Sequence, residues 1–298
     1  RSVRAKMICL HCSEPASKRC AKCPESFCSR ECQVAAWPSH KFTCSANVVV
    51  QPVEGSGMGV FARRAFAPGD MLVREKPLFI NSSDGWQAAR SQEEAEAMMA
   101  SQVDIQVPLL PEARRAAVMQ LADVYSTQAT PAGIAWTNSI PVGDDGALFA
   151  LSARFNHSCS PSARWCWRPD LDGGCLLIFA VRPIAAGEQI TVAYSKRFAT
   201  REDRMRRLQE QFKFTCACPL CSAPLDPEAD RRFVEIQRLI DAMPGACQGD
   251  HAEALDMSER TLQLLVEAGL DTPITMGPCH YEAYQLATSI GHKAKAKD

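Results

Sequence analysis

The stretch Asn156-His157-Ser158-Cys159-Ser160-Pro161 carries the most specific pattern in this chain of 298 residues. It combines hydrogen-bonding side chains and a thiol with a proline that stiffens the backbone. A serine beside a histidine would by itself suggest a hydrolase nucleophile. No Gly-x-Ser-x-Gly elbow surrounds this serine, however, so the pattern does not predict a hydrolase.

Short strands and tight turns are predicted on both sides of this stretch. Residues 175–181 form a continuous apolar run that is typical of a buried strand, and residues 189–194 alternate and are rich in β-branched side chains. The segments 62–72 and 180–190 repeat one another, each reading as a strand end, a Gly-acidic turn and a new short strand. This repetition predicts a domain of many short, bent strands.

A glycine-rich turn precedes the first repeated segment. Gly55, Gly57 and Gly59 stand at alternate positions after the predicted strand 48–50. Glycine permits unusual backbone angles and close approach of a ligand to the main chain. The spacing does not match the dinucleotide-binding fingerprint, because the third glycine comes too early and no clear helix follows. A simple hairpin bend remains the alternative interpretation.

Helices are predicted in two regions of the chain. Between the two halves of the strand-rich domain, residues 86–128 have a helical pattern, in which Ser91 and Glu94 form a capping box and residues 114–125 have helical spacing. Thr200 caps a later helix, which we expect to be stabilised by the pairs Glu202/Arg206 and Asp203/Arg207. Three amphipathic helices are then predicted at residues 229–242, 250–268 and 279–290, with breaks at Pro244, Gly245, Gly269 and Pro273.

The 15 cysteines are clustered at short spacings that are typical of metal sites. The first 46 residues supply seven thiols and the imidazole of His40 as candidate ligands, enough for two tetrahedral zinc sites, although spacing alone does not give the pairing. These eight candidate ligands are Cys9, Cys12, Cys20, Cys23, Cys28, Cys32, His40 and Cys44. So short a segment cannot bury enough apolar surface to fold alone, so metal binding is expected to drive its folding. A second cluster, Cys216-x-Cys218-x2-Cys221, supplies only three of the four ligands that a structural zinc needs.

Together these motifs resemble the SET-and-MYND-domain (SMYD) family of protein lysine methyltransferases. The Asn-His-Ser-Cys stretch, the glycine turn, Tyr194 and the later cysteines resemble a SET domain, while Cys28-Ser-Arg-Glu-Cys32 and Trp37-Pro-Ser-His40 resemble a MYND finger. The resemblance implies an α+β protein built on the SET β-clip fold of short bent strands. It further implies a helical insert, an N-terminal MYND zinc finger, a post-SET zinc site and a helical C-terminal region.

The resemblance also implies the domain boundaries. They are 1–46 for the MYND-type finger, 47–85 for the N-terminal part of the SET domain, 86–135 for the helical insert, 136–199 for the core SET domain, 200–222 for the post-SET zinc segment and 223–298 for a helical, TPR-like region.

The resemblance assigns roles to individual residues. Tyr194 is the implied catalytic residue, Phe212 lies in the substrate channel, and Phe214 is the implied lid against the adenine of S-adenosylmethionine. The implied cofactor-binding positions are Gly55, Gly57, Met58, Gly59, Asn138, Ala153, Asn156, His157, Tyr194 and Phe214. Ordinary core packing is the alternative for Ala153 and Phe214.

Three zinc ions follow from the same resemblance. In the finger, Cys9, Cys12, Cys28 and Cys32 would bind one ion, and Cys20, Cys23, His40 and Cys44 the other. Cys159 would join Cys216, Cys218 and Cys221 as the fourth ligand of the third ion.

The chain departs from the family pattern in four ways. The finger precedes the glycine motif, whereas related enzymes usually carry it as an insertion after that motif. Ser162 follows Pro161 where the family has asparagine, and Phe212 stands where the family typically has a second channel tyrosine. Glu54 and Ser56 occupy positions where family members often place basic residues that meet the cofactor carboxylate.

Composition limits the classes of function that fit. Lys and Arg number 33 against 34 Asp and Glu, which argues against a general polyanion binder, so nucleic acid is not an expected partner. No apolar run is long enough to cross a membrane and no signal-peptide pattern is present, so we expect an intracellular protein of the cytoplasm or nucleus. The leading hypothesis is transfer of methyl groups from S-adenosylmethionine to lysine in a protein substrate, histone or non-histone. The alternative is a catalytically weak scaffold that recruits protein partners through the finger.

Overall fold

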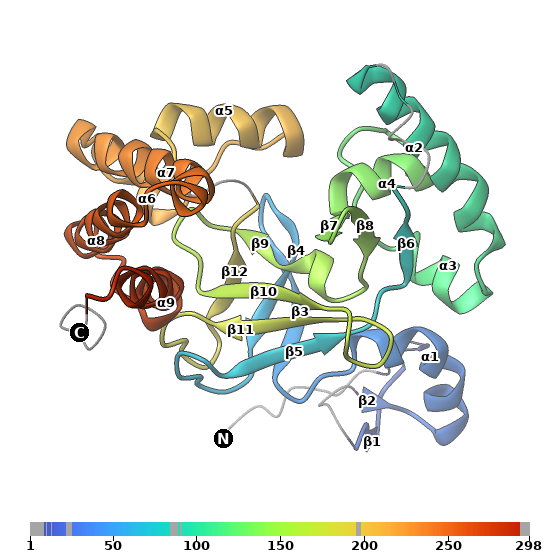
Figure 1. Cartoon of the computed structure of the whole chain (residues 1–298). Helices are drawn as coiled ribbons and strands as arrows, with labels where there is room; N and C mark the ends of the chain where they lie inside the picture. The colour runs from blue at the N-terminus through green and yellow to red at the C-terminus, as the bar shows by residue number, and fades with distance from the viewer. Residues whose placement is uncertain are drawn as a thin grey trace, which may run out of the picture. The chain divides into compact units, whose positions relative to one another are not determined.

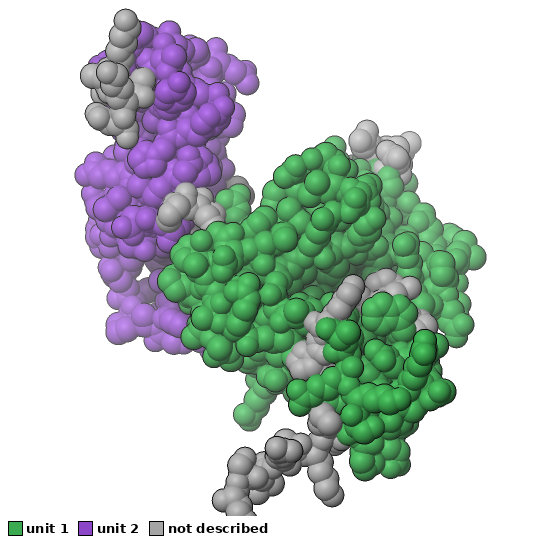
Figure 2. Space-filling model, turned by 90° about the horizontal axis from the view of Figure 1, so that it is seen from below, with its two compact units in different colours: residues 1–156, 163–191 green, residues 157–162, 192–298 purple. Residues whose placement is uncertain are grey.

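The structure, a computed structural model, describes residues 9, 11–12, 14–21, 26–83, 89, 91–194 and 198–292, without the side chains of residues 38–39, 41–43, 92 and 273–274. The chain divides into two compact units (Figure 2). Unit 1 contains residues 1–156 and 163–191, and unit 2 contains residues 157–162 and 192–298. The chain therefore passes from unit 1 into unit 2 within the Asn156-His157 stretch and again directly after Thr191.

The N-terminal finger belongs to unit 1 and has little secondary structure. Strands β1 (Lys18–Arg19) and β2 (Ser26–Phe27) are antiparallel, and helix α1 (Arg30–Thr43) follows them (Figure 1). The Ser29 hydroxyl caps this helix by accepting the Cys32 N–H at 3.2 Å. The small apolar cluster around Phe27 and Ala36 also includes Cys9, so cysteines take part in the core of this segment.

Three small sheets make up the strand-rich part of the fold (Figure 1). Their strand orders are β10-β11-β5, β3-β4-β12-β9 and β6-β8-β7. The strands are β3 (Val48–Val53), β4 (Gly57–Ala62), β5 (Met71–Glu75), β6 (Phe79–Asn81), β7 (Ile140–Val142), β8 (Asp145–Leu148), β9 (Asn156–His157), β10 (Ala163–Arg168), β11 (Cys175–Ala180) and β12 (Gln189–Val192). β11 is buried along almost its whole length, as its continuous apolar run predicts.

The two repeated sequence segments are also equivalent in the structure. Phe66 and Ile184 form an antiparallel bridge, in which the N–H of each residue donates to the carbonyl of the other at 2.9 and 3.0 Å. The carboxylates of Asp70 and Glu188 each accept a backbone N–H from three residues earlier, at 3.0 and 2.9 Å. Each Gly-acidic turn is thus closed by its own acidic side chain, which explains why the same residue pattern occurs twice.

Helices pack against the β6-β8-β7 sheet of unit 1. They are α2 (Gln92–Gln106), the 3-10 turn η2 (Val107–Leu109), α3 (Glu112–Val118) and α4 (Pro131–Asn138), and a further 3-10 turn, η3 (Ser152–Arg154), follows β8. Their buried core joins Val103 and Val118 to Leu148 of β8. The Ser91 hydroxyl accepts the Glu94 N–H at 3.1 Å, which confirms the predicted cap.

The predicted helix over residues 114–125 is wrong in its second half. Helix α3 ends at Val118, because the Asp123 carboxylate organises the following residues into a loop. It accepts the N–H groups of Tyr125, Ser126 and Thr130 at 2.9, 3.1 and 3.0 Å. A short acidic side chain that bonds to nearby backbone competes with the helix in this way.

Unit 2 is helical after the short stretch around Cys159. Its helices are α5 (Arg201–Phe212), α6 (Pro219–Ser222), α7 (Pro227–Gln248), α8 (His251–Glu267) and α9 (Pro273–Ser289). The predicted breaks at Pro244 and Gly245 are wrong, because α7 continues through both and is held by buried residues such as Met243. Pro273 lies in the first turn of α9, where its missing N–H costs no helical bond.

The α5 ion pairs also differ from those expected. Arg206 pairs with Asp203 at 2.7 Å and with Glu210 at 3.5 Å, one turn to either side of it.

The mixed α+β fold with a helical C-terminal region is confirmed. No helix among the described segments combines the length and the apolar character needed to span a lipid bilayer.

Candidate functional site

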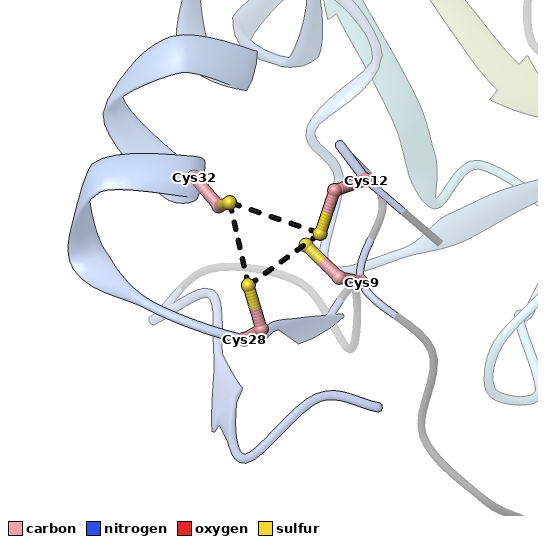
Figure 3. A group of neighbouring side chains, drawn as sticks. All are labelled: Cys9, Cys12, Cys28 and Cys32. Carbon is pink, nitrogen blue, oxygen red and sulfur yellow. Dashed lines mark hydrogen bonds between the residues drawn. The ribbon is translucent and has the colours of Figure 1, made fainter. Parts of the chain in front are cut away.

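Four finger cysteines converge on one point. The sulfurs of Cys12, Cys28 and Cys32 lie 3.3–3.9 Å apart, and Cys9 points into the same space (Figure 3). All four Sγ atoms lie within 4.8 Å of one another. Four sulfurs at about 2.3 Å from a central zinc would lie about 3.8 Å apart in a tetrahedron. The donor set and its spacing therefore fit a closed structural zinc site.

Of the four thiols in this cluster, Cys9 has a lowered pKa, whereas the pKa values of Cys12, Cys28 and Cys32 are raised by their close packing. Burial raises the pKa of the Cys9 thiol, but the backbone N–H groups of Cys28, Cys12 and His11 outweigh it and lower that pKa to about 6. A thiol with a lowered pKa supplies the thiolate that zinc binds.

A second group in the finger contains Cys20, His40 and Cys44. The sulfurs of Cys20 and Cys44 lie 3.7 Å apart, and the buried His40 ring packs edge-on against Phe27. Cys23, the expected fourth ligand, lies outside the described residues. Cys20, His40 and Cys44 thus lie close enough together to hold one metal ion, and that ion stays a prediction.

The third cysteine group lies in unit 2 and contains four buried or half-buried thiols. Cys159 lies 3.5 Å from Cys221, sulfur to sulfur, and both join Cys216 and Cys218 around the buried Leu208. A hydrogen bond shared with Cys159 lowers the pKa of Cys216 to about 3 and raises that of Cys159. The Asn-His-Ser-Cys stretch thus supplies a fourth thiol to the three-cysteine cluster, and the set fits one zinc ion.

His157 connects this cysteine group to Tyr194. Its Nδ1 accepts the Tyr194 backbone N–H at 3.0 Å, and its Nε2 lies 3.3 Å from the Cys159 sulfur. Since Nδ1 accepts, the ring proton belongs on Nε2, from which it points to the sulfur. Both ring nitrogens are therefore engaged with the protein, so a cofactor contact at His157 would use its backbone.

Tyr194 lies in an aromatic cluster of unit 2. Its ring centroid is 4.8 Å from that of Phe212, 5.4 Å from that of His157 and 6.5 Å from that of Phe214. Burial raises the pKa of Tyr194 to about 12, so the phenol stays neutral near pH 7. Tyr194 follows β12, which ends at Val192 and is shorter than the predicted strand.

The glycine turn of unit 1 contains two kinds of glycine. Gly55 and Gly57 have φ angles of +70° and +68°, which favour glycine, whereas Gly59 is required by crowding. A Cβ at Gly59 would lie 2.6 Å from Nε2 of Gln189 and 3.0 Å from Nδ2 of Asn156. Both amide nitrogens are buried and have no hydrogen-bond partner among the described residues. The side chains of Gln189, Asn156 and Val53 therefore fill the space beside Gly59, and the two unsatisfied amide donors fit a polar ligand with acceptor atoms, such as S-adenosylmethionine.

Three other predicted cofactor positions have different surroundings. The Asn138 amide nitrogen donates to the carbonyls of Ala122 and Ile134, both at 2.7 Å, so its own side-chain oxygen is the atom left for a ligand. Ala153 packs against the helical core of unit 1, and Met58 is exposed.

Two polar residues near these positions were not predicted. Gln189 faces Gly59, and Glu75 is a buried carboxylate that accepts the N–H groups of Leu151 and Ser152 at 2.8 and 2.7 Å. Burial raises the pKa of Glu75 against the opposing effect of these hydrogen bonds. Glu75 directly follows the exposed Arg74 at the end of β5, so no local signal in the sequence marked this carboxylate as buried.

Comparison with known proteins agrees with this geometry. Two family models match, the SET domain over residues 57–195 and the MYND finger over residues 9–44. The chain is a SET-and-MYND-domain protein. In this SET-and-MYND-domain protein the finger match ends before the SET match begins, as the motif order predicts.

Several relatives of this SET-and-MYND-domain protein are named as lysine methyltransferases. Histone-lysine N-methyltransferase set5 of Schizosaccharomyces pombe is 30% identical over 191 residues, which cover 63% of this chain and 54% of that protein. Human histone-lysine N-methyltransferase SMYD3 is 27% identical over 226 residues (71% and 50%), and mouse N-lysine methyltransferase SMYD2 is 25% identical over 250 residues (78% and 53%). The chain spans about half the length of these curated relatives.

Proposed function

We propose that this chain transfers methyl groups from S-adenosylmethionine to the side-chain amine of lysine in a protein substrate. The observation that carries this proposal is the neutral Tyr194 phenol, which is held among aromatic rings while its backbone is fixed by His157. The names of the relatives support the same reaction.

The aromatic surroundings of Tyr194 suit the chemistry of an amine nucleophile. In-line methyl transfer requires a neutral amine aimed at the methyl carbon. A free lysine has a pKa of about 10.4, so presenting it neutral near pH 7 costs about 4–5 kcal/mol. Apolar walls such as Phe212 and Phe214 exclude water, and the loss of water around the amine lowers its pKa. No base at the reacting atoms is then needed.

Tyr194 would position the amine rather than remove its proton. A phenol whose pKa is about 12 stays protonated, so its oxygen can accept a hydrogen bond while its O–H donates another. The Nδ1 contact from His157 fixes the backbone of Tyr194, and the Cys159 group fixes the His157 ring in turn. This chain of contacts would set the position of the hydroxyl.

The cofactor would be held mainly by backbone and amide groups. S-adenosylmethionine supplies an electrophilic methyl group when bound. We assign its binding to the glycine turn at residues 55–59 and to the unsatisfied amide of Asn156, with the Asn138 side-chain oxygen as an acceptor. The peptide bond between Asn156 and His157 joins these cofactor-binding residues directly to the segment that holds Tyr194.

We assign three zinc ions to structural roles, two in the finger and one at the Cys159 group. The finger would also bind a peptide partner, because Val34 and Trp37 on α1 expose apolar surface, with 64% and 42% of their area accessible. We expect a reducing cytoplasmic or nuclear compartment, because the cysteines cluster as metal-site ligands.

A second function, a SET-fold scaffold with weak catalysis, is favoured by two features of the sequence. Phe212 lacks the hydroxyl of a second channel tyrosine, and Glu54 and Ser56 bring no positive charge to the glycine turn. Calorimetric titration with S-adenosylmethionine separates the two functions. Micromolar binding supports the enzyme, and undetectable binding supports the scaffold. A peptide array with methyl-labelled cofactor would then identify the substrate lysine.

A further inference from the structure

Gln189 and Asn156 face the same glycine of unit 1. Gln189 begins β12, where it lies opposite Phe61 of β4, two residues along the strand from Gly59. Residues two apart on a strand share a face, so the Gln189 side chain crosses diagonally toward Gly59. Its Nε2 lies 2.6 Å from the position of a Cβ on that glycine, and the Asn156 Nδ2 lies 3.0 Å from it.

Neither amide nitrogen has a hydrogen-bond partner among the described residues, although both atoms are buried. Buried amide groups in folded proteins are nearly always paired, so each exception calls for an explanation. The two unsatisfied donors lie close together beside Gly59, so they are explained together if one ligand accepts a hydrogen bond from each of them.

The chemistry of the donors selects the part of the ligand. An amide NH2 group donates, so the ligand must present acceptor oxygens, and a carboxylate offers two of them. Glu54 and Ser56, which enter the glycine turn, supply no cation that could form an ion pair with such a carboxylate. The neutral amides of Gln189 and Asn156 are hydrogen-bond donors that lie beside the glycine turn.

We propose that Gln189, together with Asn156, binds the carboxylate of the methionine part of the cofactor. This inference rests on the proposed function and adds a residue to it. Recognition by neutral donors has a further consequence. The affinity for the cofactor should depend only weakly on ionic strength, because two neutral amides, rather than a cation, would bind the carboxylate.

The test is calorimetric titration of the full chain and its Gln189→Leu variant with two ligands. S-adenosylhomocysteine carries the amino-acid part, whereas 5′-methylthioadenosine lacks it. Loss of a hydrogen bond to a charged group should weaken S-adenosylhomocysteine binding about tenfold or more and leave 5′-methylthioadenosine binding unchanged. The matched control is Gln51→Leu, because Gln51 is an exposed residue of β3 that pairs with Gly59. Its affinities should equal those of the wild type.

A second variant keeps the proposal testable if Gln189→Leu folds poorly. Gln189→Glu has nearly the same shape but sets one carboxylate against another, so it should weaken S-adenosylhomocysteine binding by more than tenfold. Unchanged S-adenosylhomocysteine affinity in both folded variants would overturn the assignment. Equal loss of both ligands would overturn the carboxylate contact. If the wild type binds no S-adenosylhomocysteine, the proposed function fails and this inference fails with it.

Discussion

Replacing Glu75 by glutamine should destabilise unit 1, because the Glu75 carboxylate holds the turn that leads to Asn156. Its two oxygens accept the Leu151 N–H at 2.8 Å, the Ser152 N–H at 2.7 Å and the Ser152 hydroxyl at 2.6 Å. In Glu75→Gln one of these oxygens becomes an NH2 group that faces a backbone N–H. At least one buried donor then loses its acceptor.

The magnitude follows from these three contacts. A lost hydrogen bond that leaves a buried donor unsatisfied costs about 1–3 kcal/mol, so Glu75→Gln should lower the free energy of unfolding by about 2 kcal/mol. Glutamine also removes the buried negative charge of Glu75, and this gain offsets part of the stability that is lost with the hydrogen bonds. Glu75→Ala removes all three acceptor contacts and should cost about 4 kcal/mol or more.

The effect of pH has a defined sign. Burial raises the pKa of Glu75 in the folded state above its ordinary value of 4.5. The protonated form therefore favours folding, and this contribution is complete below about pH 4.5 and is lost as the pH rises through the folded-state pKa. The glutamine variant does not titrate, so the difference in stability between wild type and Glu75→Gln should narrow as the pH rises.

The assay is urea unfolding followed by circular dichroism at neutral and mildly acidic pH. Glu54→Gln is the control, since Glu54 is exposed and the change in charge is the same. The control should unfold at the wild-type urea concentration. Glu75→Gln with wild-type stability at pH 7 would refute the structural role of this carboxylate.

Three further predictions concern the aromatic and cysteine groups of unit 2. Phe212→Tyr places a hydroxyl beside Tyr194, whose ring centroid is 4.8 Å away, and should change the proportions of mono-, di- and trimethyllysine measured by mass spectrometry; identical proportions would reject this role for Phe212. Cys159→Ser should lower bound zinc by one ion per chain in elemental analysis, because four thiols share that site; undiminished zinc would contradict the assignment. Burial raises the pKa of Tyr194 to about 12, so ionisation of this phenol should cause no loss of kcat/KM between about pH 7 and pH 10. An inflection of kcat/KM in this range that disappears in Tyr194→Phe would contradict the raised pKa.

The features that the sequence predicted well are those with local or repeated signals. Cysteine spacing predicted the groups of thiols that could hold a metal, because two side chains within five residues lie close together. The repeated Gly-acidic turns were visible because each carboxylate bonds to its own turn. The Ser91 cap is likewise a contact within one helical turn.

The features that sequence reasoning missed depend on tertiary contacts. Glu75 and Ser152 are 77 residues apart, and no local pattern connects them. The loop after α3 is organised by the Asp123 carboxylate, and α7 continues past Pro244 because Met243 and the partly buried Cys247 pack into one apolar cluster. The unsatisfied Gln189 amide could be identified only from its position in space.

The most direct test of the proposed activity compares wild type and Tyr194→Phe in one experiment. Methyl-labelled S-adenosylmethionine is mixed with each protein and a substrate peptide, and label on lysine is measured beside the affinity for S-adenosylhomocysteine. The account predicts labelled lysine with the wild type, loss of about 100-fold or more with Tyr194→Phe because the amine is no longer positioned, and equal affinity for both proteins. Wild-type rates in Tyr194→Phe would contradict the role of this phenol, and absence of label with the wild type would contradict the proposed reaction.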